Sequence, residues 1–382
     1  MVGYRALAEG ADPLYLGALA SSFALPALLA AIPAGRVADK AGGTLMAFAG
    51  LVIAGGGIGA LVVFPGLVPL LISSVVIGLG QLLIMVGQQT FVAHASAGGS
   101  ADSAFGTLTA ASSVGQLIGP PAVTFAASLV IAADSPTPDT TLGLLVCLGL
   151  TLMAMPAFFF LRRIDAGLRR GRQLQTKKWA MTGNKPTSPG LWRSMLVSGA
   201  VLVTMDLMYA FVPVWATDAG VSAATVGILL ALRAAVSVVS RVGLGWLIGL
   251  LGRKATLIAS IAAATVALIA LPLSDLYGAI AVMIGLGIGL GIPQPLTMAW
   301  VIALTDPTRH GAALGLRLTV NRFAQLTLPL AVGALAAPLG VSGIFWSNAG
   351  LLAGAIAVAA GADVTGPSGK AVPDVGPEGD AT

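Results

Sequence analysis

Charged residues are scarce in this chain of 382 residues: Asp, Glu, Lys and Arg together make up only 9% of it. A soluble domain carries charge on roughly a quarter of its residues, so this chain cannot cover a globule with polar surface. Hydrophobic residues make up 57% of the sequence. Apolar runs of about 20 residues, enough to cross a bilayer as helix, recur from end to end. The sequence therefore predicts an all-α integral membrane protein and excludes a large soluble helical core.

Reactive and metal-binding side chains are equally few. The single cysteine, Cys147, lies inside an apolar run and allows no disulfide framework. The two histidines, His94 at the end of an apolar run and His310 in a connection, are expected to be exposed. The sequence contains no HExxH motif, no CxxC pair, no phosphate-binding Gly-x4-Gly-Lys-[Ser/Thr] loop and no nucleophile with a neighbouring base. We therefore expect no enzyme activity, no cofactor and no metal site.

Eleven apolar stretches are long enough to span a membrane as helices. Their approximate limits are Pro13–Ala34, Thr44–Phe64, Leu67–Ala93, Ala104–Ala132, Thr140–Leu161, Ser194–Ala216, Thr225–Leu244, Ala255–Leu273, Gly278–Leu304, Ala312–Ala337 and Val341–Gly361. Glycine and proline within them do not argue against helix, because neighbouring helices and water satisfy the freed backbone groups.

Basic residues gather in the connections on one side of these spans. The connection 162–193 holds nine Lys and Arg residues against one acid, Asp165. Other connections on that side carry Arg36, Lys40, Arg253, Lys254 and Arg309, whereas the opposite connections contain no Lys or Arg. By the positive-inside rule the basic side is cytoplasmic. The positive charge thus follows topology and gives no reason to expect nucleic acid as a partner. We expect a multi-pass protein of a bacterial cytoplasmic (inner) membrane with its C-terminus in the cytoplasm.

The same features divide the chain into parts. We expect an N-terminal helix bundle over 1–161, a basic linker over 162–193 and a six-helix bundle over 194–361. The linker is interpreted as a solvated loop that sets topology, with binding of anionic lipid heads as the alternative. Residues 362–382 are rich in Gly and Pro and are expected to form a disordered tail.

Two short segments repeat across these halves. The segments are "GRVADKAGGT" at 35–44 and "GWLIGLLGRK" at 245–254, with glycine at the first and eighth positions and an aliphatic residue at the third. Each follows one apolar span and opens the next. A repeat on this scale, separated by a basic linker, predicts two similar bundles that face each other across a cavity.

The first segment resembles the loop signature G-x-L-x-D-[RK]-x-G-x-[RK] of the major facilitator superfamily. The residues in register are Gly35, Asp39, Lys40 and Gly42, with Val37 at the Leu position and Thr44 in place of the final base. The second segment keeps Gly245, Gly252, Arg253 and Lys254 but has Gly249 and Leu250 where the acid and first base would stand. The resemblance covers nearly the whole chain.

This resemblance implies a transporter built from two rocking six-helix bundles. It also implies that Asp39 lies in a cytoplasmic gate, where it pairs with basic residues and a facing helix end in the outward-open state. The family pattern has twelve helices, and the eleven spans here correspond to helices two to twelve. We expect that the first helix is missing because the start codon was assigned too far downstream, with a natural truncation as the alternative.

A weaker similarity concerns antiporters of the same superfamily, whose fifth helix carries G-x8-G-x3-G-P-x2-G-G. The matching residues are Gly106, Gly115, Gly119 and Pro120, after which Val123 and Thr124 break the pattern. Close helix packing of the GxxxG kind explains the glycines equally well. The fourth-helix arginine of drug/proton antiporters is absent, since Ser74 stands in its place. Multidrug efflux is therefore the less favoured reading.

Three ionisable residues lie near mid-membrane on three helices of the second half: Asp206, Arg233 and Arg322. Ionisable groups at this depth are costly and indicate function, although a buried structural network would also explain them. Further polar candidates for the same site are Asn321, Gln294, Gln81 and Tyr209. Arg241 and Arg317 lie closer to the basic ends of their spans, from where their side chains can reach the membrane surface.

One acid with two bases leaves an excess of positive charge. We expect one arginine to pair with Asp206 and the other to hold an anionic group, most simply a carboxylate, by a bidentate contact. Asp206 would then take up a proton when its partner is drawn away. The sequence thus predicts a monomeric secondary transporter of a small solute, first a small organic anion, with proton coupling. The alternatives are efflux of drugs or amphiphiles, a transport-incompetent receptor of the same fold, and a membrane enzyme.

Overall fold

The computed structural model describes residues 2, 5–6, 9–10, 13–96, 101–128, 140–181, 189–218, 221, 223–336 and 340–362. Every regular element in these ranges is helical. The elements are α2 (Pro13–Ala41), α3 (Gly43–Val63), α4 (Leu67–Ala95), α5 (Ala101–Ser128), α6 (Thr140–Met181), α7 (Pro189–Asp218), α8 (Ala223–Val242), α9 (Leu244–Leu251), α10 (Arg253–Ala270), η1 (Leu271–Leu273), α11 (Leu276–Gly291), α12 (Pro293–Ala303), η2 (Pro307–Arg309), α13 (His310–Ala336) and α14 (Gly340–Ala360).

Each expected span appears as a helix, and one of them is broken into two helices. The break between α11 and α12 falls at Ile292, directly before Pro293. Proline has no N–H to continue the hydrogen-bond ladder, which explains the break. The short helix α9 follows α8 after Gly243 and lies in the second repeat, which was expected to be a loop. In the described part of the chain, eight spans are long and apolar enough to cross a membrane. The other three, α2, α5 and α13, supply much of the contact between the two bundles.

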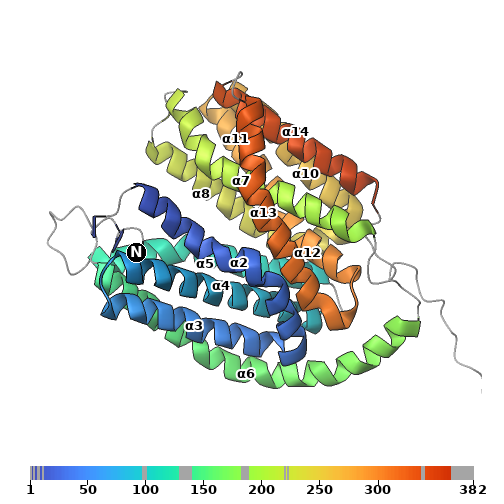
Figure 1. Cartoon of the computed structure of the whole chain (residues 1–382). Coiled ribbons are helices and arrows are strands. Elements are labelled where there is room, and N and C mark those ends of the chain that lie inside the picture. The colour runs from blue at the N-terminus through green and yellow to red at the C-terminus, as the bar shows by residue number, and fades with distance from the viewer. Residues whose placement is uncertain are drawn as a thin grey trace, which may run out of the picture.

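The helices form two bundles (Figure 1). Helices α2 to α6 pack on one another, as do α7 to α14. This division of the helix–helix contacts agrees with the predicted two-bundle membrane fold. Helix α6 differs from expectation in length, because it continues without a break to Met181 and thus makes the first part of the expected linker helical.

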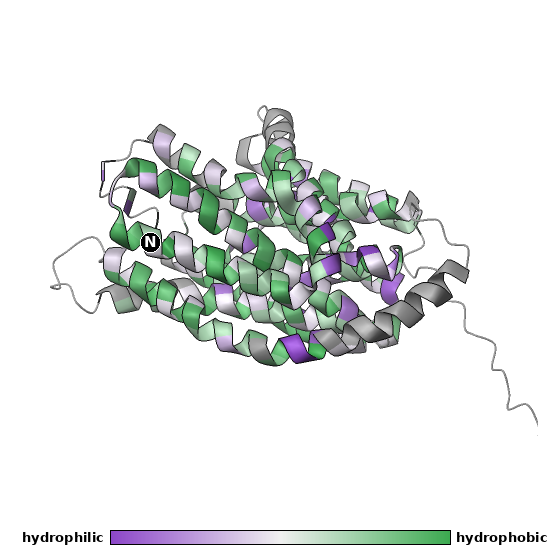
Figure 2. Ribbon diagram, turned by 60° about the horizontal axis from the view of Figure 1, so that its bottom comes forward, coloured by the Kyte–Doolittle hydropathy of each residue, from purple (hydrophilic) through white to green (hydrophobic). Residues whose placement is uncertain are grey.

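The surface of the bundles is apolar along most of the helix length. Figure 2 shows hydrophobic residues along most of the length of both bundles, with hydrophilic residues mainly toward the ends of the helices. Large apolar side chains such as Leu29, Val68 and Met153 are exposed. This is the surface expected of a protein whose surroundings are lipid instead of water. We call the end that carries Arg36, Lys40, Arg253, Lys254 and Arg309 the basic end.

At the basic end the bundles touch backbone to backbone. A Cβ added to Gly35 of α2 would lie 2.1 Å from the carbonyl oxygen of Gly311 on α13. A Cβ added to Gly315 would lie 2.2 Å from the carbonyl oxygen of Ala31. Only residues without a side chain allow helices to approach this closely. Helices α2 and α13, far apart in sequence, therefore lie against each other (Figure 1).

An apolar cluster behind this contact joins both bundles. It includes Ala93 and Phe105 from the first bundle and Met195, Met298 and Leu314 from the second, all buried. Apolar side chains packed between the bundles exclude water. The basic end of the molecule is therefore closed.

The α2–α13 contact predicts the effect of a single methyl group. In Gly35→Ala the new Cβ meets the Gly311 carbonyl, and overpacking of this kind costs about 1–3 kcal/mol. The closed state should lose population by about five- to 150-fold relative to open states. The measurement is labelling by a bilayer-impermeant maleimide of a reporter, Thr90→Cys, in a Cys147→Ser background.

Thr90 is fully buried beside Gly311, so its cysteine is protected while the bundles are closed. Gly350→Ala is the matched control, because nothing lies within 4 Å of a Cβ at that position. Faster labelling is expected in Gly35→Ala only. Equal, slow labelling in both variants would show that the backbone contact does not hold the end closed.

Candidate functional site

A cavity of about 280 Å³ lies between the two bundles. Helices α4 and α5 of the first bundle line it together with α7, α8, α12 and α13 of the second. Its lining is rich in amides and hydroxyls, including Gln88, Gln89, Ser112 and Gln116. Polar side chains in a membrane-embedded cavity are expected where a polar solute binds.

Four of the predicted site residues line this cavity: Asp206, Gln294, Asn321 and Arg322. The expected direct pair between Asp206 and an arginine is wrong. Asp206 Oδ2 accepts a hydrogen bond of 2.6 Å from Gln325 Nε2, and Gln325 Oε1 accepts one of 3.1 Å from Arg322 Nη1. Gln325 stands three residues after Arg322 on the same face of α13 and so lies between the two charges. Sequence analysis missed Gln325, although this spacing could have indicated it.

The remaining candidates lie elsewhere. Arg233 is buried and lines a second cavity of about 270 Å³. The two cavities share Ser113, Gln116, Met205 and Arg241. Gln81 is exposed and lines neither cavity. Tyr209 belongs to α7, but its side chain lies outside the described part of the structure.

Arg241 does not reach the membrane surface as expected but is buried between the bundles. Its Nη1 donates to the Thr109 carbonyl of α5 at 3.1 Å and to the Ser113 hydroxyl. Its Nε donates to the Gly291 carbonyl at 3.1 Å, and its Nη2 donates to Gln294 Oε1 at 3.0 Å. A guanidinium holds several such acceptors in one plane. Arg241 therefore ties α5 of the first bundle to α11 and α12 of the second.

Asp39, the acid of the first repeat, binds the opposite bundle. Its Oδ1 accepts from the Gly311 N–H at 2.7 Å and its Oδ2 from the Ala312 N–H at 3.0 Å. These two N–H groups open α13 and have no partner within their own helix. A carboxylate at a helix N-terminus also interacts favourably with the helix dipole. We call this pairing of Asp39 with α13 the first inter-bundle contact.

Both histidines lie at this contact and are buried, contrary to expectation. The rings of His94 and His310 stack with centroids 6.0 Å apart. His94 Nε2 lies 3.9 Å from Asp39 Oδ1, close enough for an ion pair when His94 is protonated. The sequence places His94 at the end of a span and His310 in a connection. Nothing in the sequence indicates that these two segments meet in the folded chain.

The second repeat makes its own contact between the bundles, with the charges reversed. Arg253, the first residue of α10, donates from Nε at 2.9 Å and from Nη2 at 2.6 Å to Asp102 Oδ2 in the first turn of α5. We call this pair the second inter-bundle contact.

The two contacts occupy equivalent positions in the repeat. Ala31 precedes Gly35 by four residues, as Arg241 precedes Gly245. The carbonyl of Ala31 meets Gly315, and the carbonyl of Arg241 lies 2.7 Å from a Cβ built on Gly106. Gly315 and Gly106 in turn follow Gly311 and Asp102 by four residues. Asp102 on α5 thus occupies the position equivalent to that of Gly311 on α13, whose N–H binds Asp39. The second loop lacks an acid, and the acid of its contact stands instead on the facing helix α5.

The glycines at the eighth position of each repeat share a backbone conformation. Gly42 precedes α3 with φ 98° and ψ 145°, and Gly252 precedes α10 with φ 79° and ψ 156°. Positive φ favours glycine because a Cβ would clash there. Of the other repeat residues, Lys40 is exposed, and Lys254 donates to the Ala360 carbonyl at 2.6 Å. A Cβ on Gly245 would lie 3.6 Å from Ser103 of α5.

Comparison with known proteins agrees with this geometry. The family model described as Major Facilitator Superfamily matches residues 3–215 and residues 195–378. The chain belongs to the major facilitator superfamily. No curated protein sequence matches it.

Solved structures of the superfamily share its fold. The transporter FucP in the outward conformation has a TM-score of 0.71 and 14% identity, covering 94% of this chain and 92% of that chain. A variant of the E. coli fucose:proton symporter FucP has a TM-score of 0.66 and 13% identity, covering 91% and 90%. The human organic anion transporter MFSD10 has a TM-score of 0.69 and 16% identity, covering 94% and 88%. At these identities the likeness concerns the fold alone.

The antiporter-like glycines of this superfamily member differ in their surroundings. Gly106 packs closely on α8 and α9, as its short distance to the Arg241 carbonyl requires. Gly115 and Gly119 have open space where a Cβ would stand, so close packing does not explain them. The side chain of Pro120 lies outside the described part of the structure.

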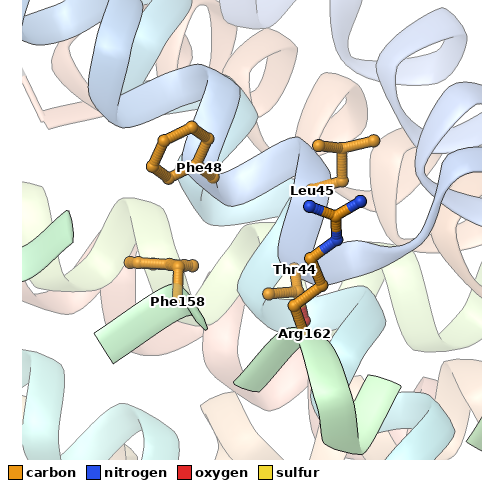
Figure 3. A pocket seen from close by; sticks show the side chains of 5 residues that line it. All are labelled: Thr44, Leu45, Phe48, Phe158 and Arg162. Atoms are coloured by element: carbon orange, nitrogen blue, oxygen red, sulfur yellow. The ribbon is translucent and has the colours of Figure 1, made fainter. Parts of the chain in front are cut away.

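A third, smaller pocket of about 100 Å³ opens between α3 and α6 at the basic end. Figure 3 shows Phe48 of α3 and Phe158 of α6 facing each other, with the Arg162 side chain reaching toward α3. Beside it the Thr44 N–H donates to Asp165 Oδ2 at 3.3 Å. Asp165, the one acid of the basic connection, therefore binds the N-terminal turn of α3 and fixes the start of the α6 extension.

The second inter-bundle contact predicts a non-additive pair of variants. Arg253→Gln leaves the buried Asp102 carboxylate without its charged partner, which costs about 1–3 kcal/mol. Asp102→Asn should do the same to a similar degree, and the double variant should cost less than the sum of the two. The measurement is the labelling rate of the buried Thr90→Cys reporter in a double-mutant cycle.

Lys254→Gln removes a neighbouring positive charge that is exposed and is expected to leave the labelling rate unchanged. Strict additivity of Arg253→Gln and Asp102→Asn would contradict a contact between the two side chains.

Proposed function

We propose that the chain is a secondary active transporter that moves a small organic anion through the central cavity by alternating access, coupled to protons. The observation that carries the proposal is the chain of contacts from Asp206 through Gln325 to Arg322 on the cavity wall. Asp206, Gln325 and Arg322 all line the cavity, so a solute in it can contact the acid and the base. A carboxylate that binds Arg322 competes with Gln325 for its guanidinium.

Asp206 is the residue proposed to carry the proton. Its side chain is exposed and accepts its hydrogen bond from Gln325. When a solute draws Gln325 and Arg322 away, the carboxylate loses a hydrogen bond and a nearby positive charge. Both losses favour uptake of a proton. Solute and proton would then cross together.

Charge favours an anion over the alternatives. The cavity of about 280 Å³ shares four lining residues with the second cavity of about 270 Å³, so size does not distinguish a small solute from a larger amphiphile. The amide lining would suit a neutral sugar, the solute class named for FucP. The three cavity arginines, Arg241, Arg317 and Arg322, against one acid favour the class named for MFSD10.

The closed basic end suggests which state of the cycle is represented. If the basic end is cytoplasmic, as the distribution of Lys and Arg indicates, the two inter-bundle contacts close the cytoplasmic side and the cavity faces outward. We propose that the chain acts as a monomer in a bacterial inner membrane with its C-terminus in the cytoplasm.

Counterflow in proteoliposomes tests the solute class and separates a carrier from a transport-incompetent receptor. The probes are benzoate, succinate and, as the neutral solute, L-fucose. Arg322→Gln should abolish uptake of the carboxylates because the amide cannot form a charge-assisted pair, a loss of about 1.5–3 kcal/mol or more. Arg163→Gln, which removes an exposed arginine of α6, is the control and should transport normally.

Uptake of L-fucose alone would overturn the anion assignment. Absence of counterflow for all three probes in the unaltered chain would contradict the proposed solute classes.

The proton role of Asp206 predicts a separation of two activities. Asp206→Asn keeps a hydrogen-bond acceptor for Gln325 but cannot take up a proton. Exchange of solute across the membrane should therefore persist, while accumulation driven by an imposed pH gradient should be lost. The measurement compares counterflow with pH-driven uptake in the same vesicles. Gradient-driven accumulation by Asp206→Asn equal to that of the unaltered chain would remove Asp206 from the coupling mechanism.

A further inference from the structure

Arg317 is a buried cation with almost no compensation. Its side chain on α13 is 1% exposed. Among the described residues it makes one hydrogen bond, from Nη2 to Thr297 Oγ1 at 3.2 Å, and its Nε is buried without a hydrogen-bond partner. A guanidinium has five N–H donors and keeps its charge. Most of the donor capacity of Arg317 is therefore unused.

Two other buried or half-buried arginines toward the basic end are held differently. Arg253 pairs with Asp102, and Arg241 donates to four acceptors on three helices. Removing a charge from water costs several kcal/mol unless a counter-charge or a full set of hydrogen bonds replaces the water. Arg317 has one neutral hydrogen-bond partner, so the free-energy cost of removing its charge from water is largely uncompensated.

The position of Arg317 offers a functional reason for burying a charge without a counter-charge. Arg317 lines the central cavity together with Arg241 and Arg322. The carboxylate among the described lining residues, Asp206, already accepts from Gln325. Arg317 lies nearer the start of α13 than Arg322, by five residues or about 7.5 Å along the helix. It therefore stands at the closed, basic end of the cavity.

We infer that Arg317 binds the anionic group of the transported solute at the closed end of the cavity. This inference deepens the proposed function, on which it rests, and assigns a residue that sequence analysis placed at the membrane surface. A carboxylate that enters the cavity first binds Arg322, where it displaces Gln325, and then comes to rest on Arg317, so transport needs both arginines.

The neighbours of Arg317 suggest the rest of the solute. Met85, Met298 and Leu318 line the same cavity and offer apolar contact. Methionine adapts its shape to irregular apolar groups. The fitting ligand is a carboxylate with a small apolar or aromatic body. Benzoate is therefore the probe, and benzamide is its uncharged isostere.

Thermal unfolding of the purified chain in lipid nanodiscs tests this without transport. A ligand that binds only the folded state raises the unfolding temperature. Benzoate should raise it for the unaltered chain and benzamide should not. Arg317→Met should lower the affinity for benzoate by about thirtyfold or more, the usual effect of removing one partner of a buried charged pair.

The same variant tests why the arginine is there. Without ligand, Arg317→Met should unfold at an equal or higher temperature than the unaltered chain, because an apolar side chain of similar length removes an uncompensated charge. Thr297 keeps a partner in this variant, since its hydroxyl donates to the Gln294 carbonyl. Arg241→Met, by contrast, should unfold at a lower temperature, because four hydrogen-bond acceptors lose their donor.

Three outcomes overturn the inference: Arg317→Met unfolds as early as Arg241→Met, it keeps the full response to benzoate, or benzoate fails to stabilise the unaltered chain. Counterflow separates this failure from that of the proposed function. If Arg317→Met still exchanges carboxylates, the anion carrier stands and Arg317 is not its anchor. If the unaltered chain exchanges L-fucose but no carboxylate, both the anion carrier and the anchor are wrong.

Discussion

The backbone contact of α2 with α13 is the constraint on which the other functional features depend. Because Gly35 and Gly311 lack side chains, the two helices approach until a Cβ on either would meet the carbonyl of the other. Only at that distance can both oxygens of Asp39 reach the first N–H groups of α13. The same approach buries His94 and His310, closes the basic end and leaves the central cavity enclosed on that side. The cavity is thus a consequence of two helices meeting at their ends.

Both segments of the repeat join the two bundles, but the first contributes an acid to the contact and the second contributes a base. In the first, a loop acid accepts from the free N–H groups of a helix. In the second, a base at the start of α10 donates to Asp102 in the first turn of α5. Both arrangements place negative charge at a helix N-terminus that faces the other bundle, where it is favoured by the helix dipole. The loss of the acid at Gly249 is therefore no loss of function in the contact, because Asp102 supplies the charge from the other side. Interactions of this kind can form in one state of a rocking carrier and break in the other.

Sequence reasoning succeeded where the determining physics is local. The apolar run lengths located the spans in the described part of the chain, and the spacing of glycines found the repeat. Helical depth placed Asp206 and Arg322 on one cavity, but it wrongly placed Arg233 with them. Sequence reasoning failed where the partner comes from another part of the chain. Arg241 and Arg317 have a depth that allows contact with the surface, but their neighbours on α5, α11 and α12 enclose them. Gln325 was missed because its importance depends on Asp206, which is 119 residues away in sequence.

The sequence by itself determined the membrane class, the family, the basic side and the two repeated glycine segments. These follow from hydrophobicity, charge and helical period, which each segment carries within itself. Only the tertiary structure decided which charges are compensated. Asp39 and the start of α13 are 272 residues apart, and Thr297, the hydrogen-bond partner of Arg317, lies on a separate helix. Whether a charge in a membrane is paired depends on what the opposite bundle presents to it, and that is fixed only when the two bundles pack.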